Sequence, residues 1–192
     1  MKFILASKSP RRRELLTNIG MKFDILESSA DESSISKDIA PHLYVQELAM
    51  LKSSSVASLV GKGFLVIGAD TVVVHNDKII GKPKDFEEAF SMLSSFSASS
   101  HKVYSGISVT DSTTARTVTD YAMTEVFFND ISPKEITDYI NTYKPFDKAG
   151  AYGIQEYASL FVEKIHGDFF NVVGLPLSKL YTLLKKEFDV II

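Results

Sequence analysis

Short apolar runs and longer amphipathic segments alternate along most of this chain, a pattern that is typical of interleaved strands and helices. The most hydrophobic run, residues 64–74, predicts one or two central strands. Other apolar or alternating runs predict further strands at residues 2–6, 23–26, 78–80, 101–110, 115–129, 160–165 and 169–173. Within this set, residues 101–110 and 115–129 predict a long antiparallel hairpin, because apolar and polar side chains alternate along both of them.

Helix starts are marked by proline at the first helical position or by acidic residues in capping order. Pro10 opens a predicted helix that ends near Gly20, and Pro41 opens a longer one that reaches about residue 60. Further helices are predicted after Asp85 and after Ser132, and a closing helix is predicted to open at Leu175-Pro176-Leu177.

This order of elements predicts an α/β fold in which a mixed sheet is flanked by helices. The strand that contains Asp70 is expected near the middle of the sheet, because its residues are apolar on both faces. The length suits a single domain over residues 1–192, either as one body or as two lobes around one cleft.

Composition narrows the functional classes. Apolar residues make up 45% of the chain, which is enough for a real core. The net charge of −3 and the pI near 5.8 argue against general nucleic-acid binding. The absence of Cys excludes disulfides, thiolate catalysis and Cys-ligated zinc, and the four His residues stand too far apart for a ligand set. No apolar run approaches the roughly 20 residues of a membrane span, so we predict a cytoplasmic protein without a membrane partner.

The turn between residues 2–6 and the Pro10 helix is rich in hydroxyls and cations. Ser7 and Ser9 precede a helix start whose backbone N–H groups attract anions, phosphate above all. Four cations lie in or beside the first helical turn, where a positive charge does not stabilise a helix: Lys8, Arg11, Arg12 and Arg13. These features predict an anion site, and a basic solvated turn is the alternative.

Asp70 is the only charged residue in the most hydrophobic run of the chain. A carboxylate among apolar side chains is costly to bury unless it is paired or bound to a metal, so we predict a functional role. The alternative is an Asp that caps a bend at Gly68 and Ala69. Lys52 continues the helical row of Tyr44 and Leu48, so its ammonium either reaches solvent at the core edge or enters a cleft.

Three further segments carry polar side chains that could serve phosphate chemistry. Glu32 lies in a Ser-rich loop, Lys82 follows the predicted hairpin, and residues 145–155 form a glycine-rich loop that ends in Gln155. Phosphoryl and nucleotidyl transfer need cations on phosphate oxygens, carboxylates that hold a metal, and a base that orients water. The alternatives are a solvated acidic loop, a surface lysine, and a connector in which Asp147 and Lys148 merely pair. A P-loop and a Gly-x-Gly-x-x-Gly dinucleotide site are both absent from the sequence.

Seven short motifs follow one another along the chain. They are Leu5-Ala6-Ser7-x-Ser9-Pro10-Arg11-Arg12, Asp31-Glu32, Tyr44-Val45-x-x-Leu48-Ala49-x-x-Lys52, Gly68-Ala69-Asp70-Thr71-Val72-Val73, Gly81-Lys82-Pro83, Asp147-Lys148-Ala149-Gly150-Ala151-Tyr152-Gly153-Ile154-Gln155 and Gly167-Asp168-x-x-Asn171-Val172-Val173-Gly174-Leu175-Pro176-Leu177. In this order they resemble the Maf family of nucleoside triphosphate pyrophosphatases, and the resemblance covers the chain from end to end.

The resemblance implies hydrolysis of a nucleoside triphosphate to a monophosphate and pyrophosphate with a divalent cation, Mg²⁺ or Mn²⁺. It also implies an elongated, inosine triphosphatase-like α/β fold with a central cleft, and a homodimer. By this resemblance Asp70 matches the catalytic acid/base position, and Glu32, Lys52 and Lys82 match residues of the cleft. We therefore predict Asp70, Lys52 and Lys82 as catalytic residues and Glu32 and Asp70 as metal ligands. The predicted substrate-binding residues are Ser7, Arg11, Arg12, Thr71 and Gln155.

Within this family, Arg11, Thr71 and Gln155 match positions that separate a dTTP/UTP subgroup from a 7-methyl-GTP subgroup. The expected substrates are therefore dTTP and UTP, together with modified pyrimidine nucleotides that the enzyme would clear. Two alternatives stay open. One is a regulatory nucleotide-binding module linked to septum formation, and the other is a pyrophosphatase of broad or modified-purine specificity.

Overall fold

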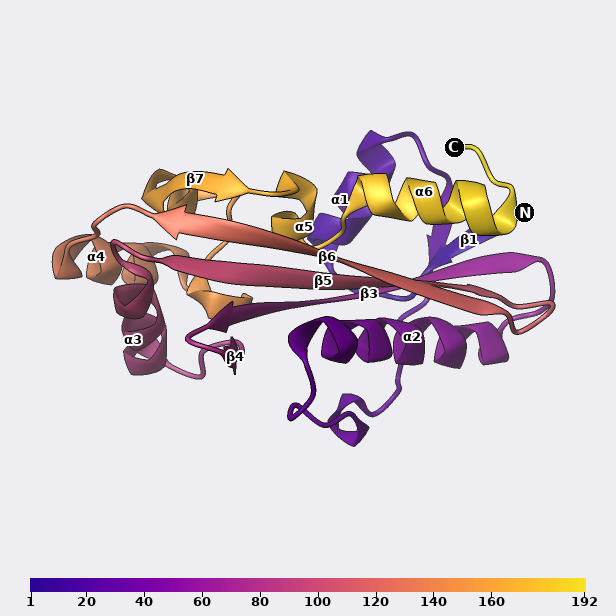
Figure 1. Cartoon of the computed structure of the whole chain (residues 1–192), viewed down its shortest axis with the longest axis horizontal. Helices are drawn as coiled ribbons and strands as arrows, with labels where there is room; N and C mark the ends of the chain where they lie inside the picture. Colours follow the sequence, from indigo (N-terminus) through magenta and orange to yellow (C-terminus); the bar gives the residue numbers. More distant parts are fainter. The chain divides into compact units, whose positions relative to one another are not determined.

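A computed structural model describes all residues from 1 to 192 (Figure 1). The chain forms a seven-stranded mixed sheet, six α-helices and three short 3₁₀ helices. It divides into two compact units. Unit 1 comprises Met1–Thr71, Ser105–Ala122 and Gly174–Ile192, and unit 2 comprises Val72–Tyr104 and Met123–Val173. None of the helices combines the length and the apolar character that crossing a membrane requires.

The sheet has the strand order β2-β1-β3-β5-β6-β7, and β4 also pairs with β3. The bounds of the strands are β1 (Lys2–Leu5), β2 (Phe23–Ile25), β3 (Phe64–His75), β4 (Lys78–Ile80), β5 (Ser100–Asp111), β6 (Thr117–Phe128) and β7 (Val162–His166). Strand β1 is parallel to both β2 and β3, whereas β4 is antiparallel to β3 and β7 is antiparallel to β6. The predicted mixed sheet is confirmed, and β3, which carries Asp70, is an inner strand of it.

All of the helices except α5 begin at or close to the starts that the sequence marks. Their bounds are α1 (Pro10–Asn18), α2 (Pro41–Leu59), α3 (Phe86–Phe96), α4 (Pro133–Tyr143), α5 (Phe169–Val173) and α6 (Leu177–Phe188), and the 3₁₀ helices are η1 (Glu32–Ser34), η2 (Ala149–Ala151) and η3 (Tyr157–Phe161). Ser132 and Glu135 form a complete capping box at α4. At α3 only half of the box forms, because the Glu88 carboxylate accepts from the backbone N–H of Lys84.

Two strand predictions need correction. Residues 169–173 form helix α5, whose first turn is fixed by the Asp168 carboxylate accepting from the backbone N–H of Phe170. Residues 160 and 161 belong to η3, so β7 begins only at Val162. A short apolar run has no period that separates helix from strand, which is the reason for both errors. The run at residues 64–74 is a single strand.

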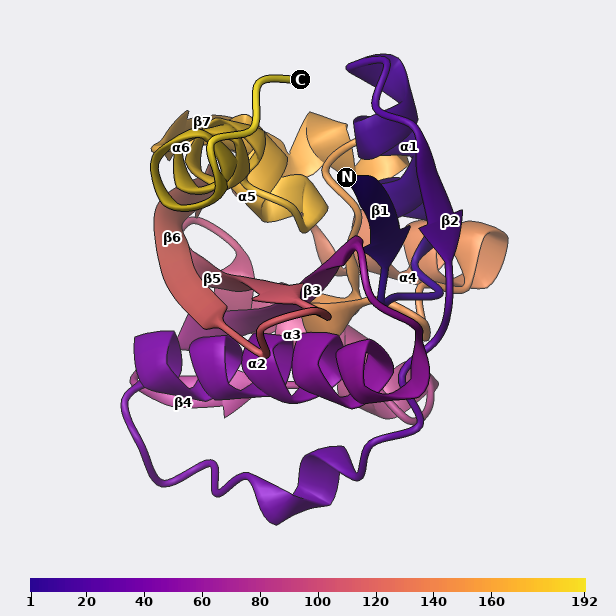
Figure 2. The same cartoon turned by 90° about the vertical axis from the view of Figure 1, so that its right-hand side faces the viewer.

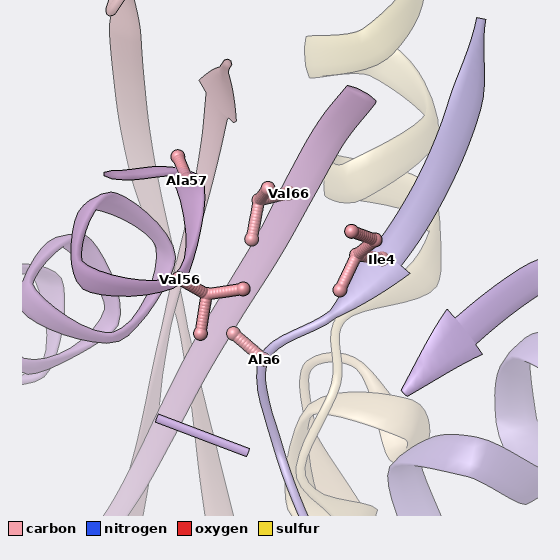
Figure 3. Packing of buried hydrophobic residues seen from close by; sticks show 5 residues of the cluster. All are labelled: Ile4, Ala6, Val56, Ala57 and Val66. Carbon is pink, nitrogen blue, oxygen red and sulfur yellow. The ribbon is translucent and has the colours of Figure 1, made fainter. Parts of the chain in front are cut away.

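In unit 1, α2 covers one face of the sheet, and α1 and α6 lie on the other (Figure 2). Val56 and Ala57 of α2 pack against Ile4, Ala6 and Val66 from β1, the residue after it and β3 (Figure 3). These side chains are all buried. Small and β-branched residues at this contact bring the helix close to the sheet.

Two glycines let the backbone of α2 touch the sheet. A Cβ on Gly68 of β3 would lie 2.1 Å from the Ala49 carbonyl oxygen, and a Cβ on Gly106 of β5 would lie 2.2 Å from the Val45 carbonyl oxygen. No side chain fits at either position. A buried set of hydroxyls continues the contact, since Ser53 Oγ lies 2.8 Å from both Ser108 Oγ and Thr110 Oγ1.

Unit 2 has a core of aromatic rings around His101. Its ring stacks on Phe96 and meets Phe128 edge to face, and its Nε2 lies 2.7 Å from the Tyr152 hydroxyl. Burial lowers the pKa of His101 to about 3, and the charge of nearby His75 acts in the same direction. His101 is therefore a neutral core residue that anchors Tyr152.

We expect Gly106→Ala to lower the free energy of unfolding by at least about 2 kcal/mol, because overpacking a close backbone contact forces the helix away from the sheet. Urea denaturation with linear extrapolation measures the loss. Gly61→Ala is the control, since a Cβ there meets nothing within 4 Å. Equal stability of the two variants would contradict this account of the α2 contact.

Candidate functional site

Seven of the predicted site residues belong to unit 1 and two belong to unit 2. Unit 1 carries Ser7, Arg11, Arg12, Glu32, Lys52, Asp70 and Thr71, whereas unit 2 carries Lys82 and Gln155. Six of the unit 1 residues form two sets of contacts, one on the α2 side of β3 and one on the α1 side.

On the α2 side, Lys52 bridges two carboxylates. Its Nζ lies 2.6 Å from Asp70 Oδ1 and 3.0 Å from Glu32 Oε1. The side chains of Lys52 and Asp70 are only 12% and 15% exposed, whereas that of Glu32 is 55% exposed. We call Glu32, Lys52 and Asp70 the carboxylate–lysine group. Lys52 thus contacts carboxylates, and its ammonium does not simply extend into solvent.

Local structure explains how Glu32 reaches this group. Asp31 caps η1, because its carboxylate accepts from both the backbone N–H and the hydroxyl of Ser33. These hydrogen bonds lower the pKa of Asp31, the side-chain bond more than the backbone one. The polar loop that the sequence predicts therefore contains one helical turn, which carries Glu32.

Tyr44 lies two turns before Lys52 on the same row of α2 and is buried. Burial raises the pKa of the Tyr44 hydroxyl, and the charges of Asp70 and Glu32 raise it further. The Tyr44 phenol therefore stays neutral beside the carboxylate–lysine group.

On the α1 side, the Arg12 guanidinium joins three distant segments. Nε donates to the Gly174 carbonyl oxygen at 2.8 Å, one terminal nitrogen to Ser7 Oγ at 3.2 Å, and the other to Thr71 Oγ1 at 3.1 Å. Thr71 Oγ1 also lies 2.8 Å from Ser105 Oγ. We call this set the arginine–hydroxyl group.

Two features of its surroundings shift the pKa of Arg12 in opposite directions. Burial lowers the pKa of Arg12, and the negative charge of Asp70 opposes that shift. The residue stays protonated, because even a lowered guanidinium pKa lies far above neutrality. Asp70 therefore influences both groups, although its carboxylate contacts only Lys52 among them.

The start of α1 has the features expected of an anion site. Pro10 occupies the first turn, the Ser9 side chain makes no capping hydrogen bond, and the first turn contains no acid. Ser7 Oγ accepts from the backbone N–H of Ser9 at 3.2 Å. Of the four cations predicted here, Lys8 pairs with Glu27 at 2.5 Å, and this hydrogen bond raises the pKa of Lys8.

In unit 2, Lys82 and Gln155 belong to two segments that contact each other. The Gly150 N–H donates to the Gly81 carbonyl oxygen at 3.0 Å, which holds the glycine-rich loop against the residue before Lys82. Lys148 of this loop forms an ion pair with Asp147, which is the pairing that the connector alternative expects. It also forms an ion pair with Glu156. Both Lys82 and Gln155 are exposed.

Sequence reasoning missed two members of the arginine–hydroxyl group, Ser105 and the Gly174 carbonyl. Ser105 looks like any small residue of an alternating strand, so nothing in the sequence marks it. Gly174 has φ +123°, a conformation that favours glycine. A glycine directly before Leu175 and Pro176 was the available signal in the sequence that the backbone at Gly174 adopts an unusual conformation.

The donor set fits a divalent cation only in part. Glu32 and Asp70 both contact one ammonium nitrogen, so their carboxylates lie close together. No group of three or more His, Cys, Asp or Glu side chains converges anywhere in the structure. Two carboxylates nevertheless suit Mg²⁺, which is commonly bound by one or two carboxylates together with water and substrate phosphates.

A model of one protein family, described as Maf-like protein, matches residues 2–187 of the chain. The chain belongs to the Maf family. Among its relatives, a Thermoanaerobacter sp. (strain X514) protein is 50% identical over 99% of this chain and 98% of that protein. An Alkaliphilus oremlandii protein is 48% identical over 97% of this chain and 96% of its own length. A Clostridium perfringens (strain SM101) protein is 47% identical over all of both chains.

These three Maf proteins are each named dTTP/UTP pyrophosphatase. Among solved structures, the Staphylococcus aureus Ham1 protein shares 14% identity with this chain and has a TM-score of 0.47, covering 68% of this chain and 73% of that one.

We expect Arg12→Lys to lower the free energy of unfolding by about 1–3 kcal/mol, because an ammonium cannot reproduce a planar fork that donates to three acceptors. Urea denaturation measures the loss. Arg13→Lys is the matched control, since Arg13 lies on the same helix and is exposed. The role of Arg12 as a link would be refuted by an Arg12→Lys protein as stable as the control.

Proposed function

We propose that this Maf protein hydrolyses dTTP and UTP to the nucleoside monophosphate and pyrophosphate. The observation that carries the proposal is the pair of contact groups on consecutive residues of β3. Asp70 belongs to the carboxylate–lysine group, and Thr71 belongs to the arginine–hydroxyl group. The names of relatives that are about half identical over the whole chain support the choice of substrates.

Asp70 is the proposed general base. Its carboxylate takes a proton from a water molecule whose oxygen attacks the α-phosphorus. The bond between the α-phosphorus and the bridging oxygen breaks, and pyrophosphate leaves with that oxygen. Lys52 and Lys82 offset negative charge that develops on the leaving group, which is the main task of a protein in phosphoryl chemistry.

Ser7, Arg11 and Arg12 are the proposed phosphate-binding residues at the start of α1. A helix start with an uncapped first turn and nearby guanidinium groups suits a triphosphate. In this arrangement Arg12 also keeps Ser7 oriented, because it donates to the Ser7 hydroxyl. Phosphate binding and the internal contacts of the arginine–hydroxyl group are therefore coupled.

Glu32 and Asp70 are the proposed ligands of a divalent cation, Mg²⁺ or Mn²⁺. A bound cation supplies charge that stabilises phosphate oxygens and the leaving pyrophosphate. Lys52 would then share its two carboxylate partners with that cation. The proposal also includes a homodimer and a location in the cytoplasm, where nucleoside triphosphates are made and used.

Arg11, Thr71 and Gln155 are the proposed determinants of base choice. The Gln155 amide offers one donor and one acceptor side, which suit the carbonyl and N3–H edge of thymine or uracil. The amide is exposed and makes no hydrogen bond to another residue of the chain. This supports a role of Gln155 toward a ligand, because an amide that only braced its own loop would make hydrogen bonds within that loop.

A turnover panel with dTTP, UTP, ATP and GTP in the presence of Mg²⁺ or Mn²⁺ tests the function. We expect kcat/KM for dTTP and UTP to exceed that for ATP and GTP by about tenfold or more, because a base without the matching edge leaves polar groups unpaired. The products identify the bond that is cleaved. Release of phosphate in place of pyrophosphate, or equal rates on all four substrates, would refute the proposal.

Asp70→Asn keeps the shape of the side chain and removes the base, so we expect kcat to fall by about 10²–10⁴-fold. Asp24→Asn, an exposed position on β2, is the matched control and should keep wild-type turnover. Circular dichroism checks that both variants fold. Wild-type turnover by Asp70→Asn would remove Asp70 from the mechanism.

A further inference from the structure

Lys148 is unusually buried for a charged residue. It is 8% exposed, and no other Lys, Arg, Asp or Glu in the chain is as buried. Burying an ammonium is costly unless partners compensate for its lost hydration. Lys148 Nζ lies 2.9 Å from Asp147 Oδ1 and 3.4 Å from Glu156 Oε2. Both carboxylates are more than two-fifths exposed, so only the lysine has been withdrawn from water.

The second partner of Lys148 immediately follows Gln155. The backbone N–H of Glu156 donates to the Gly153 carbonyl oxygen at 3.1 Å, so Gln155 lies inside a tight turn. The ion pair between Lys148 and Glu156 ties the end of that turn to the residue before η2. Gln155 makes no hydrogen bond of its own within the chain, so the direction of its amide depends on the backbone of this turn.

The stem of Lys148 supports the other end of the same turn. A Cβ on Gly153 would lie 3.1 Å from Lys148 Cε and 3.3 Å from Lys148 Cδ. The methylenes therefore occupy the space beside Gly153. Lys148 holds the turn twice, by packing at Gly153 and by charge at Glu156, and all of these residues belong to unit 2.

We infer that Lys148 is a positioning residue that fixes the Gln155 turn and thereby sets the preference for pyrimidine triphosphates. This inference rests on the proposed function, in which Gln155 reads the base. A buried ion pair contributes little net stability compared with an apolar side chain of similar size. Its use here is orientation, since a loosened turn would no longer direct the Gln155 amide.

The test compares the wild type, Lys148→Met, Gln155→Ala and the double variant on dTTP and ATP. Met keeps an unbranched stem of similar length and removes the charge. We expect Lys148→Met to lower the ratio of kcat/KM for dTTP to that for ATP by at least about fivefold, mostly through KM for dTTP. The double variant should have the same ratio as Gln155→Ala alone, because Lys148 acts through Gln155.

Lys134→Met is the matched control. Lys134 forms an exposed ion pair with Asp138 on α4 of the same unit, so its loss should leave the ratio unchanged. Glu156→Gln provides a second variant if Lys148→Met does not fold, since it breaks the same ion pair and keeps the lysine. It should lower the ratio in the same direction.

Equal losses on dTTP and ATP in Lys148→Met would show a merely structural role and overturn the inference. A further fall of the ratio in the double variant below that of Gln155→Ala would overturn it too. Hydrogen exchange of the Glu156 amide, which should speed up in Lys148→Met, reports on the turn independently of activity. A wild type without a preference for dTTP over ATP would overturn the proposed function and this inference with it. A wild-type preference for dTTP that persists unchanged in Lys148→Met would overturn the inference alone.

Discussion

Direct contact between the backbone of α2 and the sheet is the constraint on which unit 1 depends. Gly68 and Gly106 leave no side chain between the helix and the strands, so α2 lies closer than ordinary side chains permit. Lys52 lies one residue before Ser53, which packs beside Gly68, and Asp70 lies two residues beyond Gly68 on the same face of β3. The closeness of the helix is therefore what lets the Lys52 ammonium reach the Asp70 carboxylate.

The charges at this contact do not cancel. Two carboxylates share one ammonium, so the carboxylate–lysine group keeps an excess negative charge in a partly buried place. The Arg12 guanidinium, on the other face of the sheet, offsets part of this negative charge. The same attraction to Asp70 opposes the lowering of the Arg12 pKa. An additional cation would be stabilised here, and this electrostatic demand agrees with the metal that the proposed chemistry needs.

The sequence predicted those features that depend on neighbours along the chain. Asp70 stood out because it is the one carboxylate in an apolar run, and helix starts were visible at Pro10, Pro41 and Ser132. The contacts of Arg12 could not be predicted in the same way, because its partners Thr71 and Gly174 are 59 and 162 residues away. Helix α5 was missed since a run of five residues, four of them apolar, has no distinguishing period, and only the cap by Asp168 marks its start.

Asp70 and Thr71 are neighbours in sequence, yet alternation along an extended strand sends their side chains to opposite faces of the sheet. One meets α2 and the other meets the Arg12 guanidinium. Under the roles proposed above, substitutions around Thr71 would change base recognition, while the sheet screens the Asp70 carboxylate from their steric effects. In an enzyme of this design, substrate range can diverge during evolution at little cost to the reaction. Residues that choose the base and the residue that activates water lie on opposite faces of a single strand.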